Sequence, residues 1–130
     1  MLKIALRHGE RVVINGAVIA AEGRTALLVE NAAAVLRARE VMRAEEAVSP
    51  ARQLYFALQM AYLEPASRDD QRSVAADLLS ALVDAFVTDN ARALCAACAA
   101  ETAAGGYYRA LGLARRLIAA EDAALARLAA

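Results

Sequence analysis

Apolar and polar residues alternate at the start of the chain, which is the pattern of a half-buried β-strand. The alternation covers residues 2–7, and an apolar run follows over residues 12–14. Between them lies Arg7-His8-Gly9-Glu10, in which the glycine permits a tight reversal of the backbone. The pattern predicts that the first two strands form a hairpin around this turn.

Further short strands are predicted up to about residue 40. A second tight turn is predicted at Asn15-Gly16. Apolar runs at residues 17–21 and 25–30 follow it and are separated by turn residues. Residues 34–40 fit either a fifth strand or an early helix, and a strand is favoured because it would close the open edge of the sheet. In such a strand, Arg37 and Arg39 would point to the same face.

The pattern changes to a helical period after Ser49-Pro50, which resemble an N-cap followed by proline in the first turn. Helices are predicted at about residues 50–64, 69–88, 89–105 and 107 to near residue 130. The second helix has the apolar stripe Val74, Leu78, Leu82 and Phe86, with Leu79 and Val83 alongside. The last helix directs inward Leu111, Leu117, Ile118, Leu125 and Leu128. The sequence therefore predicts an α+β protein, with a small N-terminal antiparallel β module of about five strands over residues 1–47 and an α-helical bundle of about four helices over residues 48–130.

Composition limits the kinds of surface that this protein can present. The 15 basic and 15 acidic residues cancel, which argues against a globally basic nucleic-acid-binding surface and leaves only a local patch. Lys3 is the only lysine, and this arginine bias suits phosphate contacts but also follows from GC-rich coding. No apolar run has the length of a membrane span or of a signal-peptide core, so a cytoplasmic protein without membrane contact is expected.

The chain offers few groups for catalysis or metal binding. His8 has no nucleophile near it in sequence and is interpreted as a loop residue. Cys95 and Cys98 form a CxxC inside an alanine-rich helical run with no second pair, and are interpreted as small buried residues. We therefore expect no enzyme activity, no catalytic residues, no cofactor and no metal site.

The opening sequence resembles a known RNA-binding module. Met1-Leu2, Arg7, Gly9-Glu10 and Ile14 occur in the order and spacing found in the carbon storage regulator CsrA family. Residues 35–40 are similar to the last strand of that module, in which an arginine before a glutamate contacts RNA. The resemblance covers about forty residues, and CsrA-type proteins lack the helical bundle.

A second resemblance covers the whole chain. The blocks GERVVINGAVI, SPARQLYFALQMAYLE and YYRALGLARRLIAAE are similar in order and spacing to the FlbT family of flagellar biosynthesis repressors. This resemblance implies a post-transcriptional regulator that binds the 5′ untranslated region of flagellin mRNA and lowers its translation and stability while flagellar assembly is incomplete. The chain departs from the family pattern at residues 31–34, where Asn-Ala-Ala-Ala replaces a polar turn before the fifth strand.

The predicted RNA-binding residues form one small set of arginines. They would gather on one sheet edge if the first and fifth strands were neighbours, as in the CsrA-type module. The alternative is that they pair with Glu10, Glu40, Glu45 and Glu46 on a solvated surface. The residues assigned to RNA are Arg7, Arg37, Arg39 and Arg43.

The helical half suggests a second kind of surface. Its aromatic residues are expected either to line a groove for an amphipathic helix of flagellin or of a flagellar co-regulator, or simply to fill the core. In the first case the protein would be an adaptor or chaperone that leaves RNA to other proteins. An exposed strand edge favours a homodimer or higher homo-oligomer. The residues assigned to protein interaction are Tyr55, Tyr62, Tyr107 and Tyr108.

Overall fold

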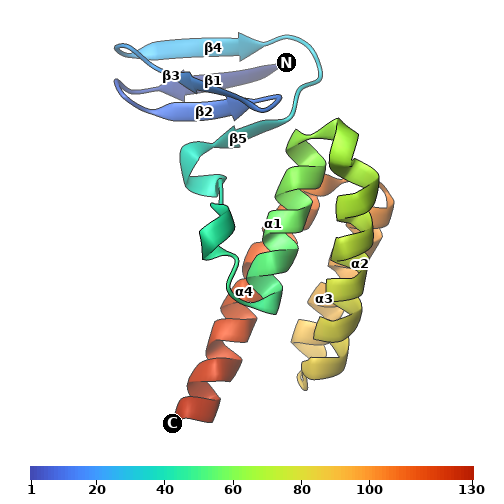
Figure 1. Ribbon diagram of the computed structural model, residues 1–130. Coiled ribbons are helices and arrows are strands. Elements are labelled where there is room, and N and C mark those ends of the chain that lie inside the picture. Colours follow the sequence, from blue (N-terminus) through green and yellow to red (C-terminus); the bar gives the residue numbers. More distant parts are fainter. The chain divides into compact units, whose positions relative to one another are not determined.

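The computed structural model describes residues 1–130 and confirms the α+β fold, with five strands followed by four helices (Figure 1). The chain divides into two compact units, Met1–Val41 and Met42–Ala130. The first unit contains β1 (Leu2–Leu6), β2 (Arg11–Ile14), β3 (Ala17–Ala20), β4 (Thr25–Val29) and β5 (Val35–Arg37). The second contains α1 (Pro50–Leu63), α2 (Arg68–Ala85), α3 (Asp89–Ala103) and α4 (Tyr107–Ala129).

The β unit consists of two small antiparallel sheets. One pairs β1 with β4, and the other has the order β3-β2-β5. Apolar side chains from both sheets form one core, because alternate residues of each strand face it. The fully buried members are Ile4, Leu6, Val12 and Ala21, against which Ile14, Leu27, Val29 and Val35 pack.

The predicted hairpin between the first two strands is wrong. β1 pairs with β4 and β2 pairs with β3 and β5, so the turn at residues 7–10 passes from one sheet to the other. The alternating pattern requires Leu6 and Val12 to face a core, and they face the same core from opposite sheets. Gly9 has φ +81°, as the predicted reversal requires.

The hairpin of this unit lies between β2 and β3, at Asn15 and Gly16. Both residues have positive φ, 51° and 84°, as a two-residue type I′ turn requires. The Asn15 side chain also accepts the Ala34 N–H at 2.9 Å, and the Asn15 N–H donates to the Ala34 carbonyl at 2.8 Å. These bonds hold the segment before β5 against the hairpin.

The fifth strand exists but is shorter than predicted. It ends at Arg37, and residues 38–40 form a 3₁₀ turn. Arg37 and Arg39 therefore do not share the face of one strand. The strand ends there because the Glu40 carboxylate accepts the Arg37 N–H at 2.9 Å and closes a turn.

The helical unit is a four-helix bundle in which α1 and α3 each pack against both α2 and α4. Ser49 caps α1 through the Arg52 N–H and Pro50 occupies its first turn, as predicted. Leu54, Leu58, Leu111 and Leu117 are completely buried between α1 and α4. Much of the remaining core is alanine, which lets helices approach closely and explains how so few aromatic residues suffice.

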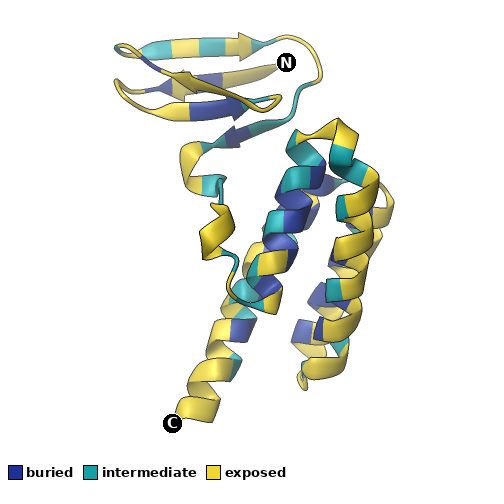
Figure 2. Cartoon of the chain, in the orientation of Figure 1, coloured by how far each residue is buried: buried dark blue, intermediate teal, exposed yellow.

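Two predicted stripes differ from the structure. On α2 the buried residues are Ala75, Leu79 and Leu82, so the stripe is rotated and Val74 is exposed. On α4, Leu125 and Leu128 are 53% and 83% exposed rather than inward. In Figure 2 the last turns of α4 are exposed and extend beyond the start of α1, which lies at the level of Glu121.

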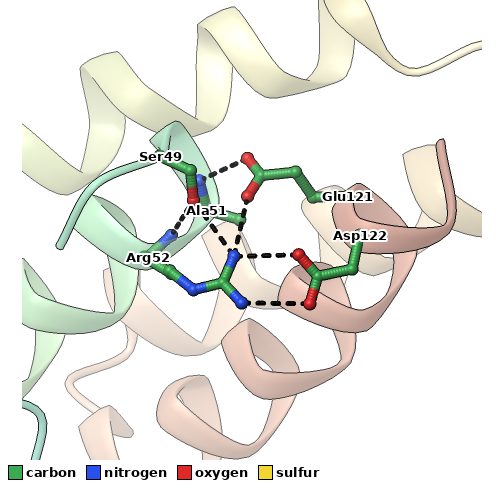
Figure 3. Close-up of polar contacts among 5 residues, drawn as sticks. All are labelled: Ser49, Ala51, Arg52, Glu121 and Asp122. Atoms are coloured by element: carbon green, nitrogen blue, oxygen red, sulfur yellow. Dashed lines mark hydrogen bonds and ion pairs between the residues drawn. The ribbon is translucent and has the colours of Figure 1, made fainter. Parts of the chain in front are cut away.

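A polar cluster joins the start of α1 to α4 (Figure 3). Glu121 is only 7% exposed, and its Oε2 accepts the Ala51 N–H at 2.9 Å. The Arg52 guanidinium forms two hydrogen bonds with Asp122, at 2.9 and 3.0 Å, and its Nη1 lies 3.5 Å from Glu121 Oε1. These hydrogen bonds with Arg52 lower the pKa of Asp122. The cluster stabilises the helix start because a carboxylate compensates its free N–H groups and dipole.

Candidate nucleic-acid interface

The β unit has a hollow of about 960 Å³ on its surface, and charged side chains contribute to its lining. Its lining comes from strand β1, from the turn at residues 7–10, from Arg24 and the start of β4, and from the end of β5 and Arg39 just after it. Five basic side chains line the hollow against one acidic side chain, Glu10. The basic residues are Lys3, Arg7, Arg24, Arg37 and Arg39.

The hollow brings together three of the four arginines assigned to RNA from the sequence, although the first and fifth strands are not neighbours, which was the condition stated for such a gathering. β5 pairs with β2 and not with β1. Arg37 instead spans the distance with its side chain, since its Nη1 donates to the Ala5 carbonyl of β1 at 3.4 Å. Arg7 follows β1 and Arg39 follows β5, and so both also reach the hollow.

Two glutamates beside these arginines accept hydrogen bonds from backbone N–H groups. Glu10 Oε1 accepts the Arg7 N–H at 2.7 Å, and Glu40 Oε1 accepts the Arg37 N–H at 2.9 Å. Each carboxylate thus closes a turn in an Arg-x-x-Glu sequence. The Arg-x-x-Glu spacing recurs at residues 43–46. It is a signal for such turns that the alternation of apolar and polar residues does not contain.

Arg43 differs from the other three arginines. It belongs to the second unit and does not line the hollow. Its Nε lies 3.1 Å from Glu46 and 3.8 Å from Glu45, so the surface pairing considered as an alternative holds for this residue. Two ion pairs within the helical unit join Arg52 to Glu121 and to Asp122.

Sequence reasoning missed Lys3 and Arg24 as members of the basic set. Arg24 follows β3 by four residues, and the turn before β4 brings it beside the β1–β2 turn. His8 connects these two turns, since its Nδ1 accepts the Gly23 N–H at 2.8 Å. His8 is therefore a structural loop residue that holds two basic segments together.

The aromatic residues assigned to protein binding do not form one surface. Tyr55 and Tyr107 are buried, and their hydroxyls accept hydrogen bonds from Arg115 at 3.3 Å and Arg72 at 3.0 Å. The Tyr62 and Tyr108 rings pack 5.9 Å apart, with Tyr108 exposed. The core-filling alternative thus describes two of the four residues.

A groove of about 350 Å³ lies instead between α2 and α3. Its lining is almost entirely apolar and contains no aromatic residue. Small side chains leave this space, because Ala76 and Ser80 on α2 face Ala96, Ala99 and Ala103 on α3.

None of the helices has the length and apolar character that a membrane crossing needs.

The two cysteines are buried, as predicted from the helical pattern. Burial raises the pKa of the Cys98 thiol to about 11 and that of Cys95 above its usual value. Because the thiolate is the reactive form, we expect alkylation of Cys98 in the native protein at pH 8 to be about a hundredfold slower than in denaturant, and that of Cys95 to be slower as well. Mass spectrometry after timed iodoacetamide treatment measures this ratio, and equal rates in both conditions would contradict the burial of the pair.

Fold and surface define a small α+β protein of two units, one with a basic hollow and the other with an apolar groove. Such surfaces are typical of a binding protein. The family model described as "Flagellar protein FlbT" matches residues 2–125. The chain belongs to the FlbT family.

Two Caulobacter relatives align with this chain over most of their length. A probable flagellum biosynthesis repressor protein FlbT of Caulobacter sp. (strain K31) is 36% identical over 122 residues, which are 93% of each chain. The flagellum biosynthesis repressor protein FlbT of Caulobacter vibrioides is 34% identical over 93% of this chain and 86% of its own. A Brucella anthropi relative is 40% identical over 65% of this chain and 56% of its own. No solved structure matches this chain significantly.

Proposed function

We propose that this protein is a cytoplasmic, non-enzymatic repressor of flagellum biosynthesis that binds the 5′ untranslated region of flagellin mRNA through the hollow of the β unit. The observation that carries the proposal is the basic hollow itself, with five cationic side chains and one carboxylate. Relatives that align over most of this chain are named flagellum biosynthesis repressors. Protein bound to the leader would occlude a hairpin or the ribosome site and so lower translation and mRNA stability.

The chemistry of the hollow suits single-stranded RNA. Guanidinium groups bind phosphates with two hydrogen bonds and also stack on unpaired bases. No tryptophan, tyrosine or phenylalanine lines the hollow, so stacking would depend on arginine alone. One carboxylate oxygen of Glu10 already accepts the Arg7 N–H, so Glu10 competes less with RNA phosphates for the arginine side chains.

Binding of a flagellin mRNA leader by the intact protein should depend strongly on salt. If up to five cations contact phosphates, the logarithm of the association constant should fall against the logarithm of salt concentration with a slope of about −2 to −3.5. Filter binding across a salt series measures this slope, and a leader of scrambled sequence shows how much of the affinity is specific. A folded protein with no affinity for the leader at low salt would refute the proposal.

A second candidate function rests on the apolar groove between α2 and α3. Such a groove accepts the apolar face of an amphipathic helix, here one from flagellin or from a flagellar co-regulator. In that case the protein is an adaptor or chaperone, and its capture of purified flagellin should not change when cations of the hollow are removed. Alanine variants of Arg37 and Arg39, which should lose RNA affinity in the first case, therefore distinguish the two functions.

A further inference from the structure

Strand β3 is an unprotected edge of the three-stranded sheet. It pairs with β2 on one side only, and its sequence Ala-Val-Ile-Ala has neither a charge nor a proline. All four residues are exposed, with Val18 at 67% and Ile19 at 38%. Proteins usually guard such edges with charges, prolines or bulges, because an open apolar edge pairs with another strand.

The hydrogen-bonding groups of this edge follow from the hairpin. Ile14 and Ala17 flank a two-residue turn and form a hydrogen-bonded pair, so Ala17 and Ile19 direct their N–H and C=O groups toward β2. Val18 and Ala20 therefore direct theirs outward. The structure shows no backbone partner for these two donors and two acceptors.

We propose that β3 is the dimerisation strand of this protein and pairs antiparallel with β3 of a second copy, around a two-fold axis at Ile19. In this register Val18 of each copy lies opposite Ala20 of the other. Each of these pairs exchanges two hydrogen bonds, so all four outward groups of both copies are satisfied. The two three-stranded sheets become one continuous six-stranded sheet.

Side chains and charges favour a second copy in this register. Ile19 of one copy lies opposite Ile19 of the other at the two-fold axis. Both side chains are on the same face of the sheet as Val12, which is opposite Ile19 in β2. Glu22, the acidic residue next to β3, falls opposite the uncharged Gly16, so no carboxylate opposes another. A register with Val18 opposite Val18 would place Ala20 opposite Gly16, which lies in the turn at φ +84° and cannot continue the ladder. An isologous pair also closes after two copies, so no edge is left for filament growth.

Charging the edge tests the proposal in the intact chain. The wild-type protein should sediment at twice its monomer mass of 13.7 kDa. Val18→Lys should raise the dimer dissociation constant at least about tenfold and yield monomer, since it places a charge on each edge. Val87→Lys, at a residue that is 86% exposed between α2 and α3, should remain a dimer. A monomeric wild type, or a Val18→Lys dimer as tight as the control, would overturn the proposal.

Cross-linking tests the register without charging the edge. Ile19→Cys places two thiols at the close, non-hydrogen-bonded position on the axis, so mild oxidation should give a covalent dimer. Val18→Cys should not, because Val18 lies opposite Ala20. The native cysteines are buried and do not interfere. Absence of the Ile19→Cys cross-link in folded protein, or a foreign protein on β3 in place of a second copy, would refute the self-pairing.

Discussion

Replacement of Glu121 by alanine is expected to lower the free energy of unfolding of the helical unit by about 3 kcal/mol. The carboxylate is buried, and its loss leaves the Ala51 N–H without an acceptor at the start of α1. An orphaned buried donor and a broken charged hydrogen bond each have a cost of this order. Urea denaturation followed by far-UV circular dichroism measures the change.

Two neighbouring substitutions serve as controls for Glu121→Ala. Asp122→Ala removes a carboxylate from the next residue, but its side chain is half exposed and binds only Arg52, so the loss should be clearly smaller. Glu121→Gln keeps an oxygen for the Ala51 N–H and should retain part of the stability. Equal losses from Glu121→Ala and Asp122→Ala would show that the buried hydrogen bond does not determine the effect.

The contribution of Asp122 to stability should also depend on pH. Its pKa is lower in the folded protein than in the unfolded chain, because Arg52 binds the ionised form. The stabilisation is therefore complete above the unfolded value of about 4 and disappears as the pH falls through the folded value. The difference between wild type and Asp122→Ala should accordingly shrink in acid.

Removal of Arg37 and Arg39 together is expected to weaken binding of the flagellin leader by about ten- to a hundredfold at low salt. Two fewer phosphate contacts should also make the salt slope shallower by about 1.4. Filter binding with the double alanine variant measures both quantities. Arg37→Ala also removes the contact with the Ala5 carbonyl, so circular dichroism must first show that the β unit is folded.

The matched control removes two arginines elsewhere. Arg109 and Arg127 are exposed on α4, and their double alanine variant changes the net charge by the same amount. It should bind the leader almost as tightly as the wild type. If both double variants lose affinity equally, general charge and not the hollow holds the RNA, and the proposed site is wrong.

The helical half was largely readable from the sequence because its signals are local. Ser49-Pro50 marks the start of α1, and Gly105, at φ +80°, lies just after α3. The apolar stripes of α2 and α4 were placed less well. A stripe shows which side of a helix is apolar, but only the lengths of the neighbouring helices decide that Leu125 stays uncovered.

The composition of the candidate site was predicted better than its construction. Arg7, Arg37 and Arg39 do line one hollow, but β1 and β5 are not paired. Lys3 and Arg24 were missed because each is unremarkable within its own segment. Their approach depends on which sheet each strand joins, and the alternating pattern is the same for either choice.

The sequence by itself determined the order of strands and helices, the turns at Gly9 and Asn15-Gly16, and the burial of the cysteines. Each of these depends on a residue's own conformational preference or on the period of the residues around it. Only the tertiary structure decided that the turn at residues 7–10 crosses between two sheets and that Arg43 belongs to the other unit, where it pairs with Glu46. The physical reason is that strand partners and shared cores join residues far apart in the chain, for which the local pattern contains no distance.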